Sequence, residues 1–485
     1  MRNFKLHFIF MFLLLTFVGE ECEAQRKTSF LNGYIYNYFN QPLYIYQCYG
    51  DTLLLIDSTV SDKHGGFVSN FGSIQNAELN VRTGLYKVVL LQNQYFYILY
   101  NGAPVEIKTT FQPSAFYNVA TDSLTVLKSD ENKQFYKFQL LQKQINIANY
   151  WLLQMMRLYP LSDPFHKQIE KEYFNRYKSL EQFVLHAPFK EKVDSNSILI
   201  AMAYYQPVLP DWKQPDSWRD SILALHYFDY FNPATSFYLN TNILPEKIDL
   251  FLKISSNKTD KYGESLIDEK LMASAAQIFL EKTRSNDVNF NFCLNYLLKK
   301  FSSDHLDNAF LSVYDNNSKP QTGDCKSGIV SENIKKRAGE LKKIAINSIA
   351  PDFNIGENLN LSGIQSEYVL LVFWASWCPH CTAELPEIKK AVAKYNERAL
   401  NAKLVTLAVS LDTDRKQWQN YITSNQLFSF LNFSELKGWQ SEVVKKYNVF
   451  ATPTMFLLDK QKKIIAKPET SQQLISAINM AEQSR

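Results

Sequence analysis

Short runs of alternating apolar and polar residues occupy the chain up to about residue 112. Turn-forming residues separate them at 40–42 (Asn-Gln-Pro), 63–66 (Lys-His-Gly-Gly) and 101–102 (Asn-Gly). Alternation with a period of two is typical of strands that bury one face. The clearest runs are residues 33–36, 43–46, 86–91 and 95–100. The pattern predicts a small antiparallel, sandwich-like β domain over residues 25–120. Its many tyrosines suit either a stacking surface for sugars or peptides or ordinary strand packing, and strand propensity favours the second.

Between about residues 125 and 345 the apolar residues recur at helical spacing instead. Apolar positions three or four residues apart lie on one face of a helix. Two stripes show this spacing: Phe135, Phe138, Leu141, Ile145, Ala148, Leu152 and Met155, and then Ile169, Tyr173, Tyr177, Leu180 and Val184. Prolines interrupt the later runs, and a charged amphipathic segment at 331–344 closes the region. We therefore predict an α-helical middle domain over residues 121–345.

Strand-like and helix-like segments alternate in residues 346–485. A buried-strand pattern at 368–373 runs through a short polar stretch into a helical pattern that continues to about residue 399. Further strands are predicted at 403–410, 428–433, 455–459 and 464–466, and further helices at 413–424, 441–447 and from residue 471. Such alternation implies a central sheet flanked by helices. The fold class is therefore multidomain, with an α/β domain at the C-terminus.

The first 24 residues predict a signal peptide. Arg2 and Lys5 precede an apolar run at 8–18, and Ala24 offers a cleavage site. The run is shorter than the roughly 20 residues that a membrane-spanning helix needs. Cys22 follows Glu21 rather than the small residue that lipidation sites favour. We expect an exported mature chain that does not span the membrane and works in the periplasm or cell envelope.

Composition and charge indicate which classes of binding partner are improbable for this chain. The chain of 485 residues is long enough for several domains, and its 46% hydrophobic and 21% charged residues are typical of folded proteins. The net charge of +4 is small for this length, and no basic run is interleaved with aromatic residues. These features argue against nucleic acid as a partner.

Most of the cysteines and histidines carry no functional signal. After the predicted leader an odd number of cysteines remains, so at least one thiol is unpaired within the chain. Cys48 and Cys293 lie in apolar segments that suit buried thiols, and a Cys293 to Cys325 bridge stays open because spacing cannot decide it. The histidines lack neighbours at metal-ligand spacing, so we expect no metal site. They are His166, His186, His226 and His305.

The strongest chemical signal is Cys378-Pro379-His380-Cys381, placed where a predicted strand meets a predicted helix. The N–H groups and dipole of a helix N-terminus stabilise a thiolate, and Pro379 suits a first helical turn. We expect Cys378 to attack a substrate disulfide and Cys381 to resolve the mixed disulfide, or the reverse sequence to oxidise a dithiol. A structural disulfide, half of a zinc site and chance are the alternatives. No second cysteine pair is available to complete a zinc site.

Four motifs carry a resemblance to a known family. They are residues 350–353 (Ala-Pro-Asp-Phe), 373–381 (Phe-Trp-Ala-Ser-Trp-Cys-Pro-His-Cys), 384–386 (Glu-Leu-Pro) and 451–454 (Ala-Thr-Pro-Thr). From about residue 349 to its end the chain resembles the TlpA/ResA branch of thioredoxin-like proteins, which implies a thioredoxin fold there. In order and size of its parts, the whole chain also resembles multidomain bacterial envelope proteins of the AhpC/TSA-like type. These place a small β domain and a helical region ahead of such a module.

The resemblance assigns roles around the cysteine pair. It implies that Pro453 is a cis-proline facing the pair and that Thr452 offers its backbone to a substrate strand. Trp377, Pro379 and His380 are expected to contact the substrate. From its chemistry alone, Pro453 also suits an ordinary turn.

Glu384 matches an acidic residue of the same branch. Its spacing from Cys381 puts both on one helix face, where a carboxylate can take the proton of the resolving thiol. A solvated helix glutamate is the alternative. Val372 stands where thioredoxins carry a buried aspartate, six residues before Cys378, so any proton relay must come from elsewhere.

The sequence therefore predicts an exported thiol-disulfide oxidoreductase that acts on protein cysteines, needs no bound cofactor and exchanges electrons with a membrane or periplasmic redox partner. The Pro-His pair resembles oxidising periplasmic enzymes, whereas most of this branch are reductases, so the direction stays open. Peroxide reduction is disfavoured because Ala375 and Leu371 replace the threonine and proline that peroxiredoxins use. A further alternative is an envelope-binding adaptor whose redox module tunes binding.

Overall fold

The computed structural model describes residues 30–71, 82–113, 116–186, 196–259, 265–318, 329–356, 359–398 and 404–483. The predicted leader and Cys22 lie outside these residues, as do Cys325 and the bridge considered for it. No helix in the described ranges has the length and apolar character needed to cross a membrane. The chain divides into two compact units, Met1–Ala309 with Asn317–Ile329, and Phe310–Asn316 with Val330–Arg485.

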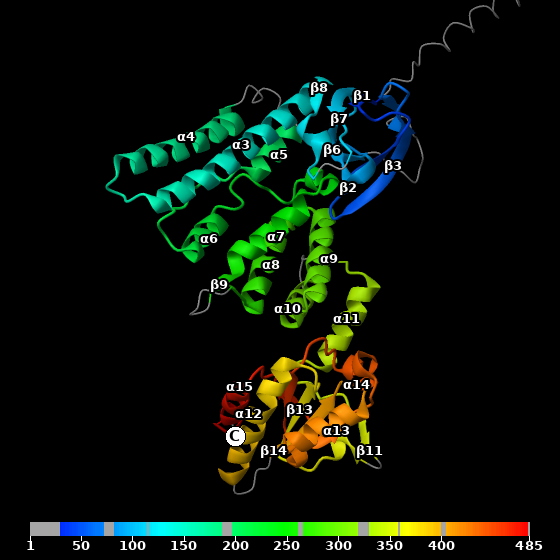
Figure 1. Ribbon diagram of the computed structural model, residues 1–485, viewed down its shortest axis with the longest axis vertical. Coiled ribbons are helices and arrows are strands. Elements are labelled where there is room, and N and C mark those ends of the chain that lie inside the picture. Colours follow the sequence, from blue (N-terminus) through cyan, green and yellow to red (C-terminus); the bar gives the residue numbers. More distant parts are fainter. Residues whose placement is uncertain are drawn as a thin grey trace, which may run out of the picture. The chain divides into compact units, whose positions relative to one another are not determined.

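Within residues 30–128, the described part of the first unit contains two four-stranded sheets, in the orders β4-β1-β7-β8 and β3-β2-β5-β6 (Figure 1). Their strands are β1 Leu31–Tyr36, β2 Pro42–Tyr49, β3 Thr52–Val60, β4 Gly66–Ser69, β5 Gly84–Val89, β6 Tyr95–Tyr100, β7 Val105–Thr110 and β8 Thr125–Lys128. The strand pairs are antiparallel except β1 with β7, which run parallel. The prediction of a purely antiparallel domain is wrong for this pair, because alternation reports a buried face and not the direction of the neighbouring strand.

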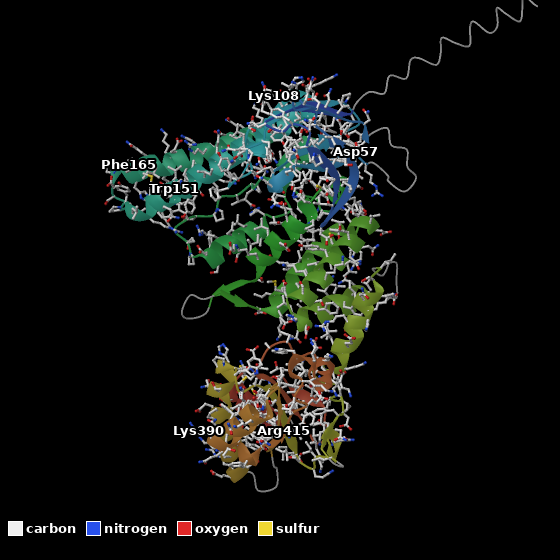
Figure 2. The ribbon with its side chains drawn as sticks, turned by 45° about the vertical axis from the view of Figure 1, so that its right-hand side comes forward. Asp57, Lys108, Trp151, Phe165, Lys390 and Arg415 are labelled. Carbon is white, nitrogen blue, oxygen red and sulfur yellow. The ribbon has the colours of Figure 1, made fainter. Side chains whose placement is uncertain are left out.

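The apolar faces of these sheets form one core. Leu31, Ile45 and Phe96 are among its fully buried members. Asp57, labelled in Figure 2, lies on β3. It accepts a hydrogen bond from the Ser69 hydroxyl on β4, which links the two sheets. Several of the tyrosines noted in the sequence belong to the core, whereas others are exposed. Tyr38 and Tyr86 are buried, and Tyr36 and Tyr44 are exposed.

The helical region continues the same compact unit. Its helices are α2 Val119–Asp122, α3 Asp130–Leu158, α4 Pro164–His186, α5 Asn196–Tyr204, α6 Asp216–Leu225, α7 Ile243–Ser256, α8 Glu269–Thr283 and α9 Asp287–Ser303, with the hairpin β9 Asn257–Thr259 and β10 Ser265–Ile267. The next helix, α10 Asp307–Asn317, begins in this unit, but its residues 310–316 belong to the second unit. The two apolar stripes fall on α3 and α4. Asn132 on α3 is fully buried, accepts a hydrogen bond from the Leu99 N–H at 2.7 Å and donates one to the Leu99 carbonyl at 2.8 Å. Such contacts explain why the β and helical regions, expected as separate domains, share one unit.

The second unit is built on a five-stranded sheet in the order β15-β14-β13-β16-β17. Its elements are α11 Glu332–Lys343, β11 Asn354–Gly356, β12 Leu359–Asn360, β13 Tyr368–Trp374, α12 Pro379–Arg398, β14 Leu404–Ser410, α13 Arg415–Ser424, β15 Leu431–Phe433, α14 Glu442–Lys446, β16 Thr454–Leu458, β17 Ile464–Ala466 and α15 Ser471–Gln483. Strand β13 is parallel to β14 and antiparallel to β16. All seven residues of β13 are buried, as its unbroken apolar sequence requires.

Candidate functional site

Cys378 and Cys381 lie where the central strand β13 gives way to helix α12. The helix begins at Pro379, whose missing N–H leaves no helical hydrogen bond unmade in the first turn. The Cys378 carbonyl accepts a hydrogen bond from the Thr382 N–H at 3.0 Å, so Cys378 stands at the N-cap of α12. The sequence therefore places Cys378 at the N-terminus of α12 and Cys381 in the first turn of that helix.

The two thiols are in direct contact. Both cysteines are free thiols in this structure, and their Sγ atoms are 2.7 Å apart. The Cys381 N–H donates to the Cys378 Sγ across an N to S distance of 3.2 Å. Cys378 is 5% exposed and Cys381 is fully buried. Only Cys378 can therefore be reached from solvent, which suits it to be the attacking thiol.

The surroundings move the two thiol pKa values in opposite directions. Burial alone would raise the pKa of Cys378. The hydrogen bonds that its sulfur accepts, from the Cys381 thiol and from backbone N–H groups of Cys381 and His380, outweigh burial and lower that pKa below its usual value. Burial raises the pKa of Cys381 to about 12, and the hydrogen bond to Cys378 also holds its proton in place. The pair therefore consists of an outer thiol poised to ionise and an inner thiol that stays protonated.

The loop before β16 faces the pair. Strand register places Thr454 opposite Phe373, which brings residues 451–453 beside the turn that follows β13. The Thr452 carbonyl oxygen lies 3.2 Å from the Cys378 Sγ, although 74 positions separate the two residues. The Thr452–Pro453 peptide bond is cis, the geometry that the resemblance implied for Pro453.

The side chains expected to meet a substrate surround the recessed sulfur. Pro379 and His380 are exposed. Trp377 is 53% exposed, and its ring centroid lies 6.4 Å from that of Trp439. Trp439 was not singled out from the sequence, because its position beside Trp377 depends on a contact across 62 residues.

Glu384 is neither fully exposed nor without a hydrogen-bond partner. It is half-buried on α12, and its carboxylate accepts a hydrogen bond from the Ser471 N–H, the first residue of α15. This contact fastens α12 to α15. Its proposed part in proton transfer stays a prediction. Val372 is fully buried in β13, so the position that holds an aspartate in thioredoxins is apolar here.

A buried carboxylate that the sequence analysis missed supports the turn before Cys378. Asp412 is 1% exposed and follows the end of β14. It accepts hydrogen bonds from the Ser376 N–H at 3.1 Å, the Ser376 hydroxyl at 2.5 Å and the Ser410 hydroxyl at 2.6 Å. The run Ser-Leu-Asp, which begins at the last residue of a buried strand, was the available signal. Polar residues at the carboxyl ends of parallel strands gather at one edge of the sheet.

The other cysteines and histidines lie outside this site. Cys48 on β2 and Cys293 on α9 are buried, and burial raises the pKa of both thiols, that of Cys48 to about 12. The described residues contain no cluster of histidine, cysteine or carboxylate side chains that could hold a metal ion. His166 contacts the Tyr159 carbonyl at 2.9 Å, and His226 pairs with Asp229. The side chain of His186 is not among those described.

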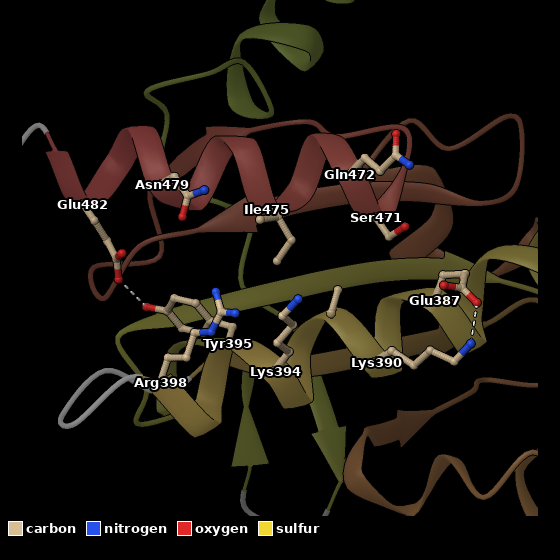
Figure 3. Close-up of a pocket in the computed structure, with 11 residues that line it drawn as sticks. Glu387, Lys390, Lys394, Tyr395, Arg398, Ser471, Gln472, Ile475, Asn479 and Glu482 are labelled. Carbon is tan, nitrogen blue, oxygen red and sulfur yellow. Dashed lines mark hydrogen bonds and ion pairs between the residues drawn. The ribbon is translucent and has the colours of Figure 1, made fainter.

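A groove of about 560 Å³ between α12 and α15 includes neither cysteine (Figure 3). Lys390, Lys394 and Arg398 of α12 line one side, and Glu387 pairs with Lys390. The Tyr395 hydroxyl donates to Glu482 of α15 across the groove (Figure 3). The groove follows the part of α12 beyond the active-site turn.

Comparison with known proteins identifies the family. Residues 366–464, which include both active-site cysteines and Pro453, match the family described as thioredoxin-like. The sporulation thiol-disulfide oxidoreductase A of Bacillus subtilis (strain 168) is 30% identical over 123 residues, which cover 24% of this chain and 70% of that protein. The chain belongs to the thioredoxin-like family, in its TlpA/ResA-type branch. The thiol-disulfide oxidoreductase ResA of Bacillus thuringiensis subsp. konkukian (strain 97-27) is 28% identical over 145 residues, 29% of this chain and 78% of ResA.

Among solved structures, a thioredoxin-like protein from Bacteroides caccae aligns with 57% of this chain and 97% of its own, at 19% identity and a TM-score of 0.36. The sequence relatives place the chemistry in the second compact unit. This thioredoxin-like chain is a thiol-disulfide oxidoreductase.

Proposed function

We propose that this protein is an exported oxidoreductase that exchanges disulfides with protein cysteines through the Cys378 and Cys381 dithiol. The observation that carries the proposal is the pair itself, a thiol that is 5% exposed and has a lowered pKa, 2.7 Å from a fully buried thiol of raised pKa. Nucleophilic attack requires a thiolate, and resolution requires a second thiol within bonding reach. Both requirements fit these two residues.

The reductive reaction runs in two exchanges. The Cys378 thiolate attacks one sulfur of a substrate disulfide, forms a mixed disulfide and releases the first substrate thiolate. Cys381 then loses its proton and attacks the Cys378 sulfur, which releases the second substrate thiolate and closes the Cys378 to Cys381 disulfide. Two electrons pass to the substrate, and the two protons of the dithiol end on the substrate thiols. The reverse sequence oxidises a substrate dithiol.

The neighbouring residues take the roles expected from the sequence. Trp377, Pro379 and His380 contact the substrate around Cys378, and Thr452 offers backbone to it. Pro453 shapes the loop that carries Thr452. Glu384 takes the proton of Cys381 during resolution, since that thiol otherwise keeps its proton at neutral pH.

Export to the periplasm or cell envelope is supported by the charged and apolar pattern of residues 1–24. The cysteines carry the electrons themselves, so the reaction needs no bound cofactor, and a membrane or periplasmic redox partner regenerates the pair. The peroxiredoxin alternative is weak because Ala375 and Leu371 stand where peroxiredoxins have a threonine and a proline. The residues that activate a peroxidatic thiolate are therefore missing. The adaptor alternative predicts that binding persists without either cysteine.

The reduction potential of the pair tests the proposal. The full chain, with Cys48, Cys293 and Cys325 replaced by serine, is equilibrated with glutathione, and its dithiol and disulfide forms are quantified. We expect a reversible disulfide, with about −270 mV marking a reductase and about −120 mV an oxidant. Cys381→Ser should accumulate mixed disulfides with a scrambled, disulfide-bonded protein substrate, whereas Cys378→Ser should not. Failure to form a reversible disulfide would exclude this function and favour the adaptor.

A further inference from the structure

Helix α3 carries a further apolar stripe on the side opposite its buried face. Four large apolar side chains of this helix are each between 53% and 79% exposed: Leu140, Ile147, Trp151 and Leu158. Leu158 lies two residues after the buried Met156, which turns it about 200° from the buried face at 3.6 residues per turn. Leu140 stands in the same relation to the buried Phe138. A helix that is apolar on both sides is usually covered on both sides.

The exposed stripe has the spacing with which one helix packs against another. When Gln144 and Gln154 are included, its positions advance from 140 to 158 in alternate steps of four and three residues. These are the apolar positions of a heptad, which form the contact between two helices of a coiled coil. The stripe extends over about 27 Å of helix. Figure 2 shows Trp151 on the outer part of the hairpin that α3 and α4 form, away from the β-sheets.

The stripe is also symmetric about its own middle. Counted outward from Asn149, residues at equal distances are alike in kind, as three pairs: Ile147 with Trp151, Gln144 with Gln154, and Leu140 with Leu158. In an antiparallel helix pair related by a two-fold axis, residues equally far from the axis face each other. An axis at the level of Asn149 therefore places apolar residues against apolar residues. It also places an amide against an amide, and two amides can exchange hydrogen bonds.

A groove of about 1100 Å³ adjoins the N-terminal half of the stripe. Leu140 and Ile147 line it on the α3 side, and residues from 121–126 of α2 and β8 line the other side. The two-fold arrangement brings the C-terminal end of the second copy's α3 to this groove. Leu158, 79% exposed at that end, then lies level with Leu140. The groove is therefore completed by a second copy of the same chain.

The charges beside the stripe also favour a second copy. Lys143 pairs with Asp122 at 2.7 Å. Lys133 lies 3.6 Å from Asp130. These lysines are already neutralised by carboxylates of their own chain, whereas attraction to anionic lipid depends on a basic face. The two-fold arrangement places Lys143 level with Met155 of the second copy, so like charges do not meet there.

We infer that two copies of this chain pair through α3, antiparallel and related by a two-fold axis at the level of Asn149. Trp151 of each copy packs against Ile147 of the other, and the end of each α3 enters the other copy's groove. The interface belongs to the first compact unit. It is therefore independent of the proposed redox function, and each dimer carries two Cys378 and Cys381 pairs.

Sedimentation equilibrium of the full-length protein tests the inference. We expect a dimer at micromolar concentration. Trp151→Glu should weaken dimerisation at least about 100-fold, because each dimer would bury two unpaired carboxylates among apolar side chains. Trp218→Glu is the matched control, since Trp218 lies on α6 of the same unit and is 44% exposed, and it should leave the dimer intact. Circular dichroism checks that both variants keep their helix content.

Cysteine cross-linking tests the antiparallel register. Cys325, Cys378 and Cys381 are replaced by serine, and Gln144→Cys and Gln154→Cys are introduced singly and together. Under mild oxidation the double variant should form covalent dimers. Each single variant should stay monomeric on a denaturing gel, because equivalent positions lie about 15 Å apart along the helix axis. Covalent dimers of the single variants would mean a parallel pair and would overturn the two-fold arrangement.

Two outcomes of sedimentation would reject the dimer through α3. One is a monomer of the unaltered protein throughout the micromolar range, and the other is a dimer that Trp151→Glu leaves intact. A monomeric protein that sediments with phosphatidylglycerol vesicles would also overturn the inference and would assign the stripe to a membrane surface. None of these outcomes bears on the reversible disulfide of Cys378 and Cys381, so the proposed function is tested separately.

Discussion

At the scale of single residues, the site separates two chemically identical thiols by their surroundings. Cys378 receives hydrogen bonds at the helix N-terminus, and these outweigh its burial. Cys381 is fully buried one turn later and donates to the Cys378 sulfur. Deprotonation is therefore easier for the outer thiol. The separation also keeps the inner thiol from attacking before a mixed disulfide has formed.

This separation predicts the pH dependence of alkylation. With the reduced protein, the rate of Cys378 modification by iodoacetamide should rise with pH and reach its plateau below the usual thiol pKa, because the thiolate is the reacting form and its pKa is lowered. Cys381 should stay unmodified over the same pH range, because burial raises the pKa of its thiol. Mass spectrometry of labelled peptides identifies the sites. Cys48 and Cys293, buried and with raised pKa values, are internal controls that should stay unlabelled in the native protein.

At the scale of secondary-structure elements, Glu384 joins two helices and also lies one turn from Cys381. Glu384→Gln keeps an oxygen that can accept the Ser471 N–H but loses the ability to take a proton. We expect the release of product from the mixed disulfide to slow by at least about tenfold, since general-base assistance commonly contributes that much or more. Single-turnover kinetics reports the role of Glu384 in proton transfer, and thermal unfolding reports its role in joining the two helices. A normal rate for Glu384→Gln, with lost stability for Glu384→Ala, would leave only the structural role.

Element order was largely predictable in the second unit and less so in the first. The buried strand at β13 and the helix that starts at Pro379 follow from local apolar periodicity and turn chemistry. The parallel pairing of β1 with β7 does not, because 74 residues separate Leu31 from its partner Val105 and periodicity carries no partner information. For the same reason, the sequence analysis did not identify Asp412 and Trp439. Their importance lies in contacts with Ser376 and Trp377 that no local pattern contains.

At the scale of the whole molecule, the two compact units differ in chemistry. The described cysteines of the first unit, Cys48 and Cys293, are buried with raised thiol pKa values, whereas the second unit holds the Cys378 and Cys381 pair. Within the first unit, Asn132 ties the helical region to the β region through both backbone groups of Leu99. Stability of the first unit and reactivity of the second therefore depend on different residues.

Asn132→Ala tests this separation. The change leaves the buried Leu99 N–H and carbonyl without their partner, so it should lower the free energy of unfolding of the first unit by about 2–3 kcal/mol. Hydrogen exchange resolved by peptide should show the loss around β6 and α3. The exposed Asn101→Ala, which removes only a local turn contact, should change stability by less than about 0.5 kcal/mol. The reduction potential of the Cys378 and Cys381 pair should be the same in both variants as in the unaltered protein, because the hydrogen bonds that the structure gives this pair come from residues of the second unit. A shift of that potential in Asn132→Ala would mean that the β and helical region governs the redox pair, and the adaptor alternative would then regain support.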